Sequence, residues 1–210
     1  MPRALKVYTE LFEFDSAIRT EYPVFCGIDE AGRGPLAGDV YAAAVILPEG
    51  LEIPGLNDSK KLSEKRREEL APIIKEQAAA WCIASASVAE IEALNILQAA
   101  LLAMQRAVAG LKTQPVFAIT DGNQAPVLPM PVQTVISGDA KSASIAAASV
   151  LAKTARDAAL RELDAQYPQY GFAAHKGYGT KAHYEAIDQY GICPAHRPSF
   201  LEKYYERKGQ

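Results

Sequence analysis

Four carboxylate residues stand where short apolar segments of the sequence end. Asp29 and Glu30 follow the segment "VFCGI", Asp121 follows "VFAIT", and Asp139 follows "VQTVIS" after one glycine. In open α/β sheets, ligands gather outside the carboxyl ends of the strands. We therefore expect these four side chains to meet at one edge of a sheet.

Four carboxylates that lie close together repel one another, and their pKa values rise unless cations neutralise them. A set of ligands made only of oxygen atoms suits hard cations such as Mg²⁺ or Mn²⁺. Two such ions, about 3.5 to 4 Å apart, activate a water molecule and stabilise the leaving oxygen of a phosphodiester. The cluster therefore predicts phosphodiester hydrolysis with two divalent ions as cofactors.

Short apolar runs bounded by polar or turn residues predict the strands that position these carboxylates. The predicted strands lie at 22–29, 39–47, 80–88 and 115–121. Helices are predicted at 64–80 with Ser63 as the N-cap, at 90–109 and at about 142–164. Small residues along one face of the last helix, including Ala148 and Ala152, would allow it to pack closely on a sheet.

Strands that alternate with helices predict an α/β fold, with a mixed sheet flanked by helices. From "YPQYGFAAHKGYGT" onward, Gly, Tyr, His and Lys crowd together, which indicates a loop that leads into a helix around 180–190. We therefore divide the chain into a catalytic core at 1–165 and a second part at 166–210. The second part holds a substrate loop and a small C-terminal helical appendage packed on the core.

Length and composition exclude several classes of protein. The chain has 210 residues, of which 49% are hydrophobic, enough for one sizeable core. No apolar run reaches the ~18 residues that span a bilayer, and acidic residues occupy the segment where a secretory signal would be apolar. The three cysteines are odd in number and widely spaced, which favours neither a disulfide framework nor a zinc site. We expect a cytoplasmic monomer with no membrane partner.

The formal net charge of -3 hides an uneven distribution. Acidic residues outnumber basic ones before residue 140, and basic residues outnumber acidic ones after it. The C-terminal third is therefore the part of the chain expected to contact phosphate groups.

Several segments together resemble bacterial ribonuclease HII, the type 2 family of ribonucleases H. The matching segments are "GIDEAGRGPLAG" at 27–38, "LNDSKKLS" at 56–63, "TDGN" at 120–123, "GDAKSASIAAASVLAKTARD" at 138–157, "HKGYGT" at 175–180 and "HRPSF" at 196–200. They span most of the chain in the order that the family has. One departure is Asp39, which stands where the family usually has proline.

The resemblance implies a ribonuclease H-like fold and an endonuclease that cuts the RNA strand of RNA-DNA hybrids. It also implies cleavage on the 5′ side of single ribonucleotides embedded in duplex DNA, leaving 3′-hydroxyl and 5′-phosphate ends. The expected partners are thus RNA-DNA hybrids and DNA duplexes that contain ribonucleotides. By motif, the metal ligands and catalytic residues are Asp29, Glu30, Asp121 and Asp139, the four found above from strand ends alone.

Two loops of the resemblance imply recognition of the ribonucleotide. Gly32, Arg33 and Gly34 match a loop whose backbone contacts the ribose 2′-hydroxyl, and glycine lets a main chain approach a sugar closely. Without the resemblance, these glycines are equally well explained as a tight turn. Tyr178 matches a tyrosine that packs on the following deoxyribose.

Further residues are candidates for contacts with the nucleic-acid backbone. Lysine side chains and helix N-termini both attract anions. The candidates are Lys60, Lys61, Lys141 and Ser142, together with His175 and Lys176 beside the substrate loop. In contrast, Lys65, Arg66 and Arg67 alternate with glutamates and are expected on a solvated helix face. Arg197 is expected to anchor the appendage through local polar contacts.

Three alternatives remain. Another metal-dependent nuclease of the same fold would share the carboxylates but would have no need of the Gly-Arg-Gly loop and Tyr178. Ribonuclease HIII carries a large extra N-terminal domain, for which the position of Asp29 leaves no room. A non-catalytic nucleic-acid-binding module would gain nothing from four acidic residues, which oppose phosphate binding in the absence of metal.

Overall fold

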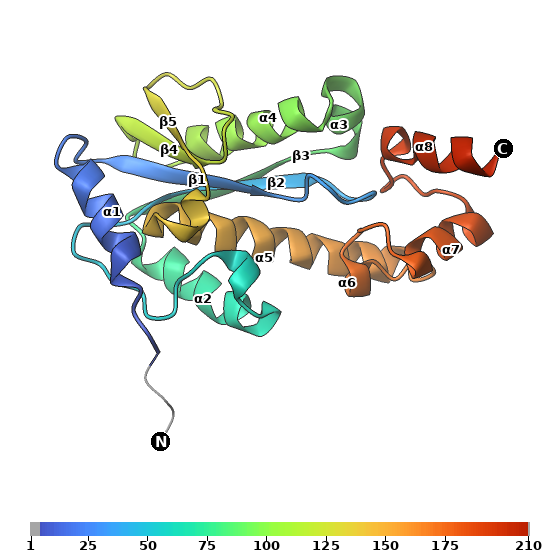
Figure 1. Cartoon of the computed structure of the whole chain (residues 1–210), viewed down its shortest axis with the longest axis horizontal. Coiled ribbons are helices and arrows are strands. Elements are labelled where there is room, and N and C mark those ends of the chain that lie inside the picture. The colour runs from blue at the N-terminus through green and yellow to red at the C-terminus, as the bar shows by residue number, and fades with distance from the viewer. Residues whose placement is uncertain (1–4, 210) are drawn as a thin grey trace.

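The computed structural model describes residues 5–209, which build one mixed five-stranded sheet with helices on both faces (Figure 1). The strands, in sheet order, are β3 (Ala80–Ala86), β2 (Val40–Ile46), β1 (Phe25–Ala31), β4 (Phe117–Asp121) and β5 (Val132–Val135). β2 runs antiparallel to both β1 and β3, and β4 runs parallel to both β1 and β5. This arrangement confirms the predicted α/β class and its mixed sheet.

The sequence of β2, "VYAAAVI", explains why this strand lies well inside the sheet. Six of its seven residues are buried, so the strand shows a continuous apolar run instead of alternation. β5 is short and largely exposed. The sequence shows this segment only as an apolar run ahead of Asp139. In the structure it pairs with β4 at the edge of the sheet.

Two helices, α3 (Val88–Leu94) and α4 (Ile96–Ala109), cover one face of the sheet (Figure 1). The sequence had predicted a single helix at 90–109. The chain instead breaks at Asn95, which adopts a left-handed backbone with φ 71°. Its side-chain oxygen accepts hydrogen bonds from the amides of Leu97 and Gln98, so Asn95 caps the second helix.

The other face carries the long helix α5 (Ala143–Gln166), with α2 (Glu64–Gln77) and α1 (Thr9–Arg19) packed beside it (Figure 1). Ser63 caps α2 as predicted, and Ser142 caps α5 in the same way, because each hydroxyl accepts an amide hydrogen bond from the first turn. The sequence had not predicted α1. Its buried Asp15 accepts bonds from the hydroxyls of Ser142 at 2.5 Å and Ser144 at 2.6 Å. The carboxylate thus holds the N-terminus of α5.

The appendage consists of α6 (Phe172–His175), α7 (Lys181–Tyr190) and α8 (Pro198–Lys208), gathered at one end of the sheet (Figure 1). Its core also includes Leu36, Ala37 and Leu160, which come from the first part of the chain. The division at residue 165 therefore stays a prediction. Within residues 5–209, no helix is both long and apolar enough to cross a membrane.

Candidate active site

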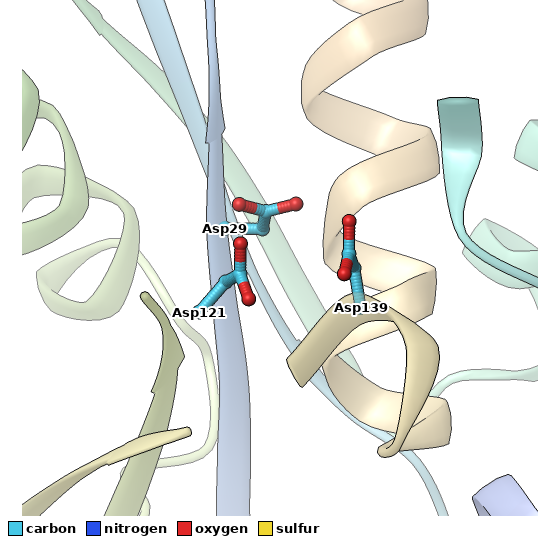
Figure 2. A group of neighbouring side chains, drawn as sticks. All are labelled: Asp29, Asp121 and Asp139. Carbon is cyan, nitrogen blue, oxygen red and sulfur yellow. The ribbon is translucent and has the colours of Figure 1, made fainter. Parts of the chain in front are cut away.

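Three of the four predicted carboxylates converge at one edge of the sheet (Figure 2). Asp29 lies on β1, Asp121 ends β4, and Asp139 lies in the short turn η2 (Gly138–Ala140) that precedes α5. Each offers an oxygen atom, and these atoms all lie within 4.8 Å of one another. The parallel pairing of Ile28 with Thr120 brings Asp29 and Asp121 side by side.

The backbone holds these carboxylates in place before any ligand binds. Asp121 Oδ1 accepts a hydrogen bond of 2.6 Å from the amide of Gly138, which ties the end of β4 to the turn that carries Asp139. Asp29 Oδ1 accepts a bond of 2.7 Å from the amide of Glu30. The geometry of the cluster is therefore preorganised.

Burial of these carboxylates makes their negative charge costly unless a cation neutralises it. Asp29 and Asp139 are each only 4% exposed. Burial, followed by the nearby Glu30 and Asp121 carboxylates, raises the pKa of Asp29 well above its ordinary value. The carboxylate oxygens are buried, and they repel one another. Oxygen ligands of this kind suit a hard cation, so the residues fit a divalent ion.

Glu30 stands apart from the group of three, because successive residues of a strand point to opposite faces. Its carboxylate pairs with Arg33, 3.3 Å away. Burial raises the pKa of Glu30, although the Arg33 charge opposes this shift. Glu30 nevertheless lines the same cavity of about 260 Å³ as Asp29 and Asp121, so it can reach a ligand bound there.

Lys60 reaches the cluster from the turn η1 (Ser59–Lys61). Its Nζ atom lies 3.0 Å from Oδ2 of Asp139, while most of its side chain is exposed. Asp58 caps this turn by accepting a bond of 2.8 Å from the amide of Lys60. Ser59 fixes the turn to α5 through a bond of 2.7 Å with Ser149.

The Gly-Arg-Gly loop, residues 32–34, runs along the cavity between the carboxylates and Tyr178. Gly32 has φ +105°, and a Cβ atom there would lie 2.1 Å from Nε of Arg156. Glycine is thus required at 32 by a buried arginine of α5, in addition to any sugar that approaches from solvent. Arg156 donates to the carbonyls of Ala37 and Lys176, each at 3.0 Å, and so joins two loops.

Tyr178 lies directly across from Gly34. A Cβ atom at Gly34 would be 3.6 Å from the tyrosine ring, and the ring is 48% exposed. Gly177 has φ +78°, and a Cβ there would approach the carbonyl oxygen of Ala37 to 2.7 Å. The amide of Leu36 donates to the carbonyl of Gly177 at 2.8 Å. Backbone contacts therefore bring the two predicted recognition loops together.

The remaining predicted contacts fall into two groups. Lys61 and Lys141 are exposed near the cluster. Ser142, in contrast, is buried and bonded to Asp15, so it does not face solvent. His175 accepts from the amide of Gly177 and bonds to the carbonyl of Tyr170, and Lys176 pairs with Glu64 at 2.8 Å. Ser142, His175 and Lys176 are therefore engaged in contacts within the protein and stabilise the loop or the helix.

Three cations that the sequence did not single out also line the cavity: Arg67, Lys153 and Arg156. Arg67 had been expected on a solvated face, and that expectation is wrong. Its side chain is 11% exposed and donates to the carbonyls of Ser59 and Leu62. Asp157 accepts from both Arg67 and Lys153, at 3.3 and 2.6 Å. The Lys153–Asp157 pair is local to α5, whereas only the fold brings Arg67 to Asp157, which is 90 positions away.

Comparisons with known proteins identify the family to which the chain is similar. A family model described as Ribonuclease HII matches residues 26–203. Ribonuclease HII of Vibrio campbellii is 56% identical over 201 residues, covering 95% of this chain and 93% of the relative.

Solved structures show the same fold. Ribonuclease H2 from Pyrococcus horikoshii superposes with a TM-score of 0.71 at 24% identity, covering 89% of this chain and 99% of the other. Bst-RNase HIII in complex with Mn²⁺ has a TM-score of 0.63 at 17% identity, covering 80% of this chain and 63% of the other.

Proposed function

The chain belongs to the ribonuclease HII family, an endoribonuclease family of the ribonuclease H type, and from this premise we propose its substrate and chemistry. We propose that it hydrolyses the RNA strand of RNA-DNA hybrids and cuts 5′ of single ribonucleotides embedded in duplex DNA. The products carry 3′-hydroxyl and 5′-phosphate ends. Mg²⁺ or Mn²⁺ serves as the cofactor.

The observation that carries this proposal is the shared cavity of catalytic and recognition residues. Asp29 and Asp121 line it together with Gly32, Arg33 and Tyr178. A 2′-hydroxyl is both a donor and an acceptor, so backbone groups of a glycine loop can distinguish ribose from deoxyribose. A phosphodiester next to the recognised sugar would lie against the carboxylates.

The carboxylates suit a divalent cation by their chemistry. Asp29, Asp121 and Asp139 would hold it directly, and Glu30, which lines the same cavity as Asp29 and Asp121, would join them. A pair of such ions supplies an activated water and charge stabilisation at the leaving oxygen. The Mn²⁺ complex of Bst-RNase HIII, a protein of the same fold, supports this choice of cation.

The protein residues have the tasks of holding and orienting the substrate strand. Lys60 and the exposed Lys61 and Lys141 neutralise backbone phosphates, which fixes the strand without reading its sequence. The Tyr178 ring supports the sugar that follows the ribonucleotide. We assign the enzyme to the cytoplasm, because its three cysteines are free thiols, as is usual in a reducing compartment.

Matched duplexes that contain one, four or no ribonucleotides test the proposal. With Mg²⁺, the native protein should cut the first two and leave the third intact. An Asp139→Asn variant should cut none, and EDTA should abolish all cleavage. Equal cutting of the all-DNA duplex, or full activity in EDTA, would contradict the proposed function.

A further inference from the structure

Arg197 begins the last helix of the appendage, yet its guanidinium group is buried against the Gly-Arg-Gly loop. It is 0% exposed and donates to four backbone carbonyls of the loop and of the residues that follow it. The acceptors are the carbonyl oxygens of Gly32 at 2.8 Å, Arg33 at 3.2 Å, Pro35 at 2.8 Å and Gly38 at 2.5 and 2.9 Å. Its partners are thus not local, as the sequence had suggested, but lie in the Gly-Arg-Gly loop and the residues that follow it.

These bonds determine which way the amide groups of the loop point. In a trans peptide, the carbonyl of one residue and the N–H of the next point in opposite directions. Because the carbonyls of Gly32 and Arg33 face Arg197, the N–H groups of Arg33 and Gly34 face away from it. The Pro35–Leu36 peptide unit follows the same rule. The carbonyl of Pro35 faces Arg197, and the N–H of Leu36 donates to Gly177, beside Tyr178.

The two outward amides are available for a ligand. Within residues 5–209, neither the Arg33 nor the Gly34 amide has a hydrogen-bond acceptor. Both residues are exposed and line the cavity that also holds Asp29 and Tyr178. The loop therefore presents two adjacent donors on the side where the substrate would lie.

We propose that Arg197 is a positioning residue for ribonucleotide recognition. It draws the loop carbonyls inward and thereby aims the amides of Arg33 and Gly34 at the 2′-hydroxyl of the ribonucleotide. Arginine suits this task because its planar fork carries five donors, whereas lysine carries three on one atom. The inference rests on the proposed function. It adds Arg197 as the residue that positions the loop for the distinction of ribose from deoxyribose.

The test compares binding of two duplexes that differ by one 2′-hydroxyl. Affinities are measured in an Asp139→Asn background, with Mg²⁺, for a duplex with one ribonucleotide and for the same duplex made of DNA. Adding Arg197→Lys should lower the ratio of the two affinities at least fivefold, while affinity for the all-DNA duplex stays unchanged. The control is Ile187→Ala, which opens a buried position of α7 at a residue that is not among the partners of Arg197. It should lower Tm and leave the ratio intact.

An unchanged ratio in Arg197→Lys, or an equal loss in Ile187→Ala, overturns the inference. If the Asp139→Asn protein does not distinguish the two duplexes, the proposed function is contradicted instead. Should Arg197→Lys fail to fold, amide hydrogen exchange of the Asp139→Asn protein decides the question. The Arg33 and Gly34 amides should exchange rapidly in the free protein and slow at least tenfold with the ribonucleotide duplex, but not with the all-DNA duplex. Absence of this selective protection overturns the inference.

Discussion

The ammonium group of Lys60 lies 3.0 Å from the carboxylate of Asp139, which is 79 positions away in the chain. Burial alone would lower the pKa of Lys60, but its hydrogen bond to Asp139 raises it. In the protein without metal, this lysine therefore supplies part of the positive charge that the aspartates require. It must compete with any cation for Asp139.

Lys60→Met removes this competitor, so we expect Mn²⁺ to bind more tightly while cleavage becomes slower through loss of a phosphate contact. The gain in affinity should be about two- to fivefold, since an exposed ion pair contributes only about 0.2 to 1 kcal/mol. Isothermal titration with Mn²⁺ measures it. Lys61→Met is the control, because Lys61 makes no ion pair within residues 5–209. Weaker Mn²⁺ binding in Lys60→Met would contradict this account.

Asp29→Asn should uncouple activity from stability. Removing one buried charge relieves repulsion, so the metal-free protein should gain on the order of 1 kcal/mol, or about 2 to 4 °C in Tm. Cleavage with Mg²⁺ should fall at least about 100-fold. Thermal melts in EDTA and single-turnover assays check both effects, with the exposed Glu49→Gln as control. A destabilised variant, or one with normal turnover, is incompatible with a cation role for Asp29.

The appendage should lose stability in mild acid because of His183. This residue is fully buried, its Nδ1 lies 2.9 Å from the carbonyl of Tyr178, and its Nε2 lies 3.0 Å from Nε2 of His196. Burial lowers the pKa of His183 from 6.5 to about 4. Between these values the unfolded chain takes up a proton that the folded chain resists. The stabilisation is therefore complete above pH 6.5 and is lost as the pH falls toward 4.

Thermal melts between pH 8 and pH 4 measure this dependence. His183→Gln should melt at a lower temperature at pH 8, but its Tm should fall less steeply below pH 6.5. Parallel curves for the two proteins would show that His183 does not carry the effect.

Tyr178 offers a ring and a hydroxyl, and two variants separate their contributions. Tyr178→Phe loses only a hydrogen bond, about 0.5 to 1.5 kcal/mol. Tyr178→Ala also loses stacking, roughly 1 to 3 kcal/mol more. Single-turnover rates on duplexes with one and with four ribonucleotides measure the losses, and the alanine variant should suffer most on the single ribonucleotide. Equal losses on both duplexes would make Tyr178 a general backbone contact.

The sequence predicted that Asp29, Asp121 and Asp139 would lie close together because the determinants of this arrangement are local. Asp29 and Asp121 each follow an apolar run, and parallel strands bring such ends together without further information. The Ser63 and Ser142 caps were equally predictable, since a cap involves only the first turn of its own helix.

Polar contacts between residues far apart in the chain could not be predicted from local sequence patterns. The Arg197 bonds to the Gly-Arg-Gly loop span about 160 positions, and Arg67 meets Asp157 across 90. The break at Asn95, which has φ 71°, was missed because the apolar period continues across it. Sequence patterns therefore located the carboxylates and loops, but not the buried arginines that hold them.

The most direct test of the central claim is the position and chemistry of the cut in a duplex with one ribonucleotide. If carboxylate-bound ions activate water, cleavage with Mg²⁺ occurs on the 5′ side of the ribonucleotide. The upstream fragment then ends in a 3′-hydroxyl that a polymerase extends directly. A cut on the 3′ side that leaves a 2′,3′-cyclic phosphate would mean that the 2′-hydroxyl itself is the nucleophile, and it would contradict the assignment of Asp29, Asp121 and Asp139.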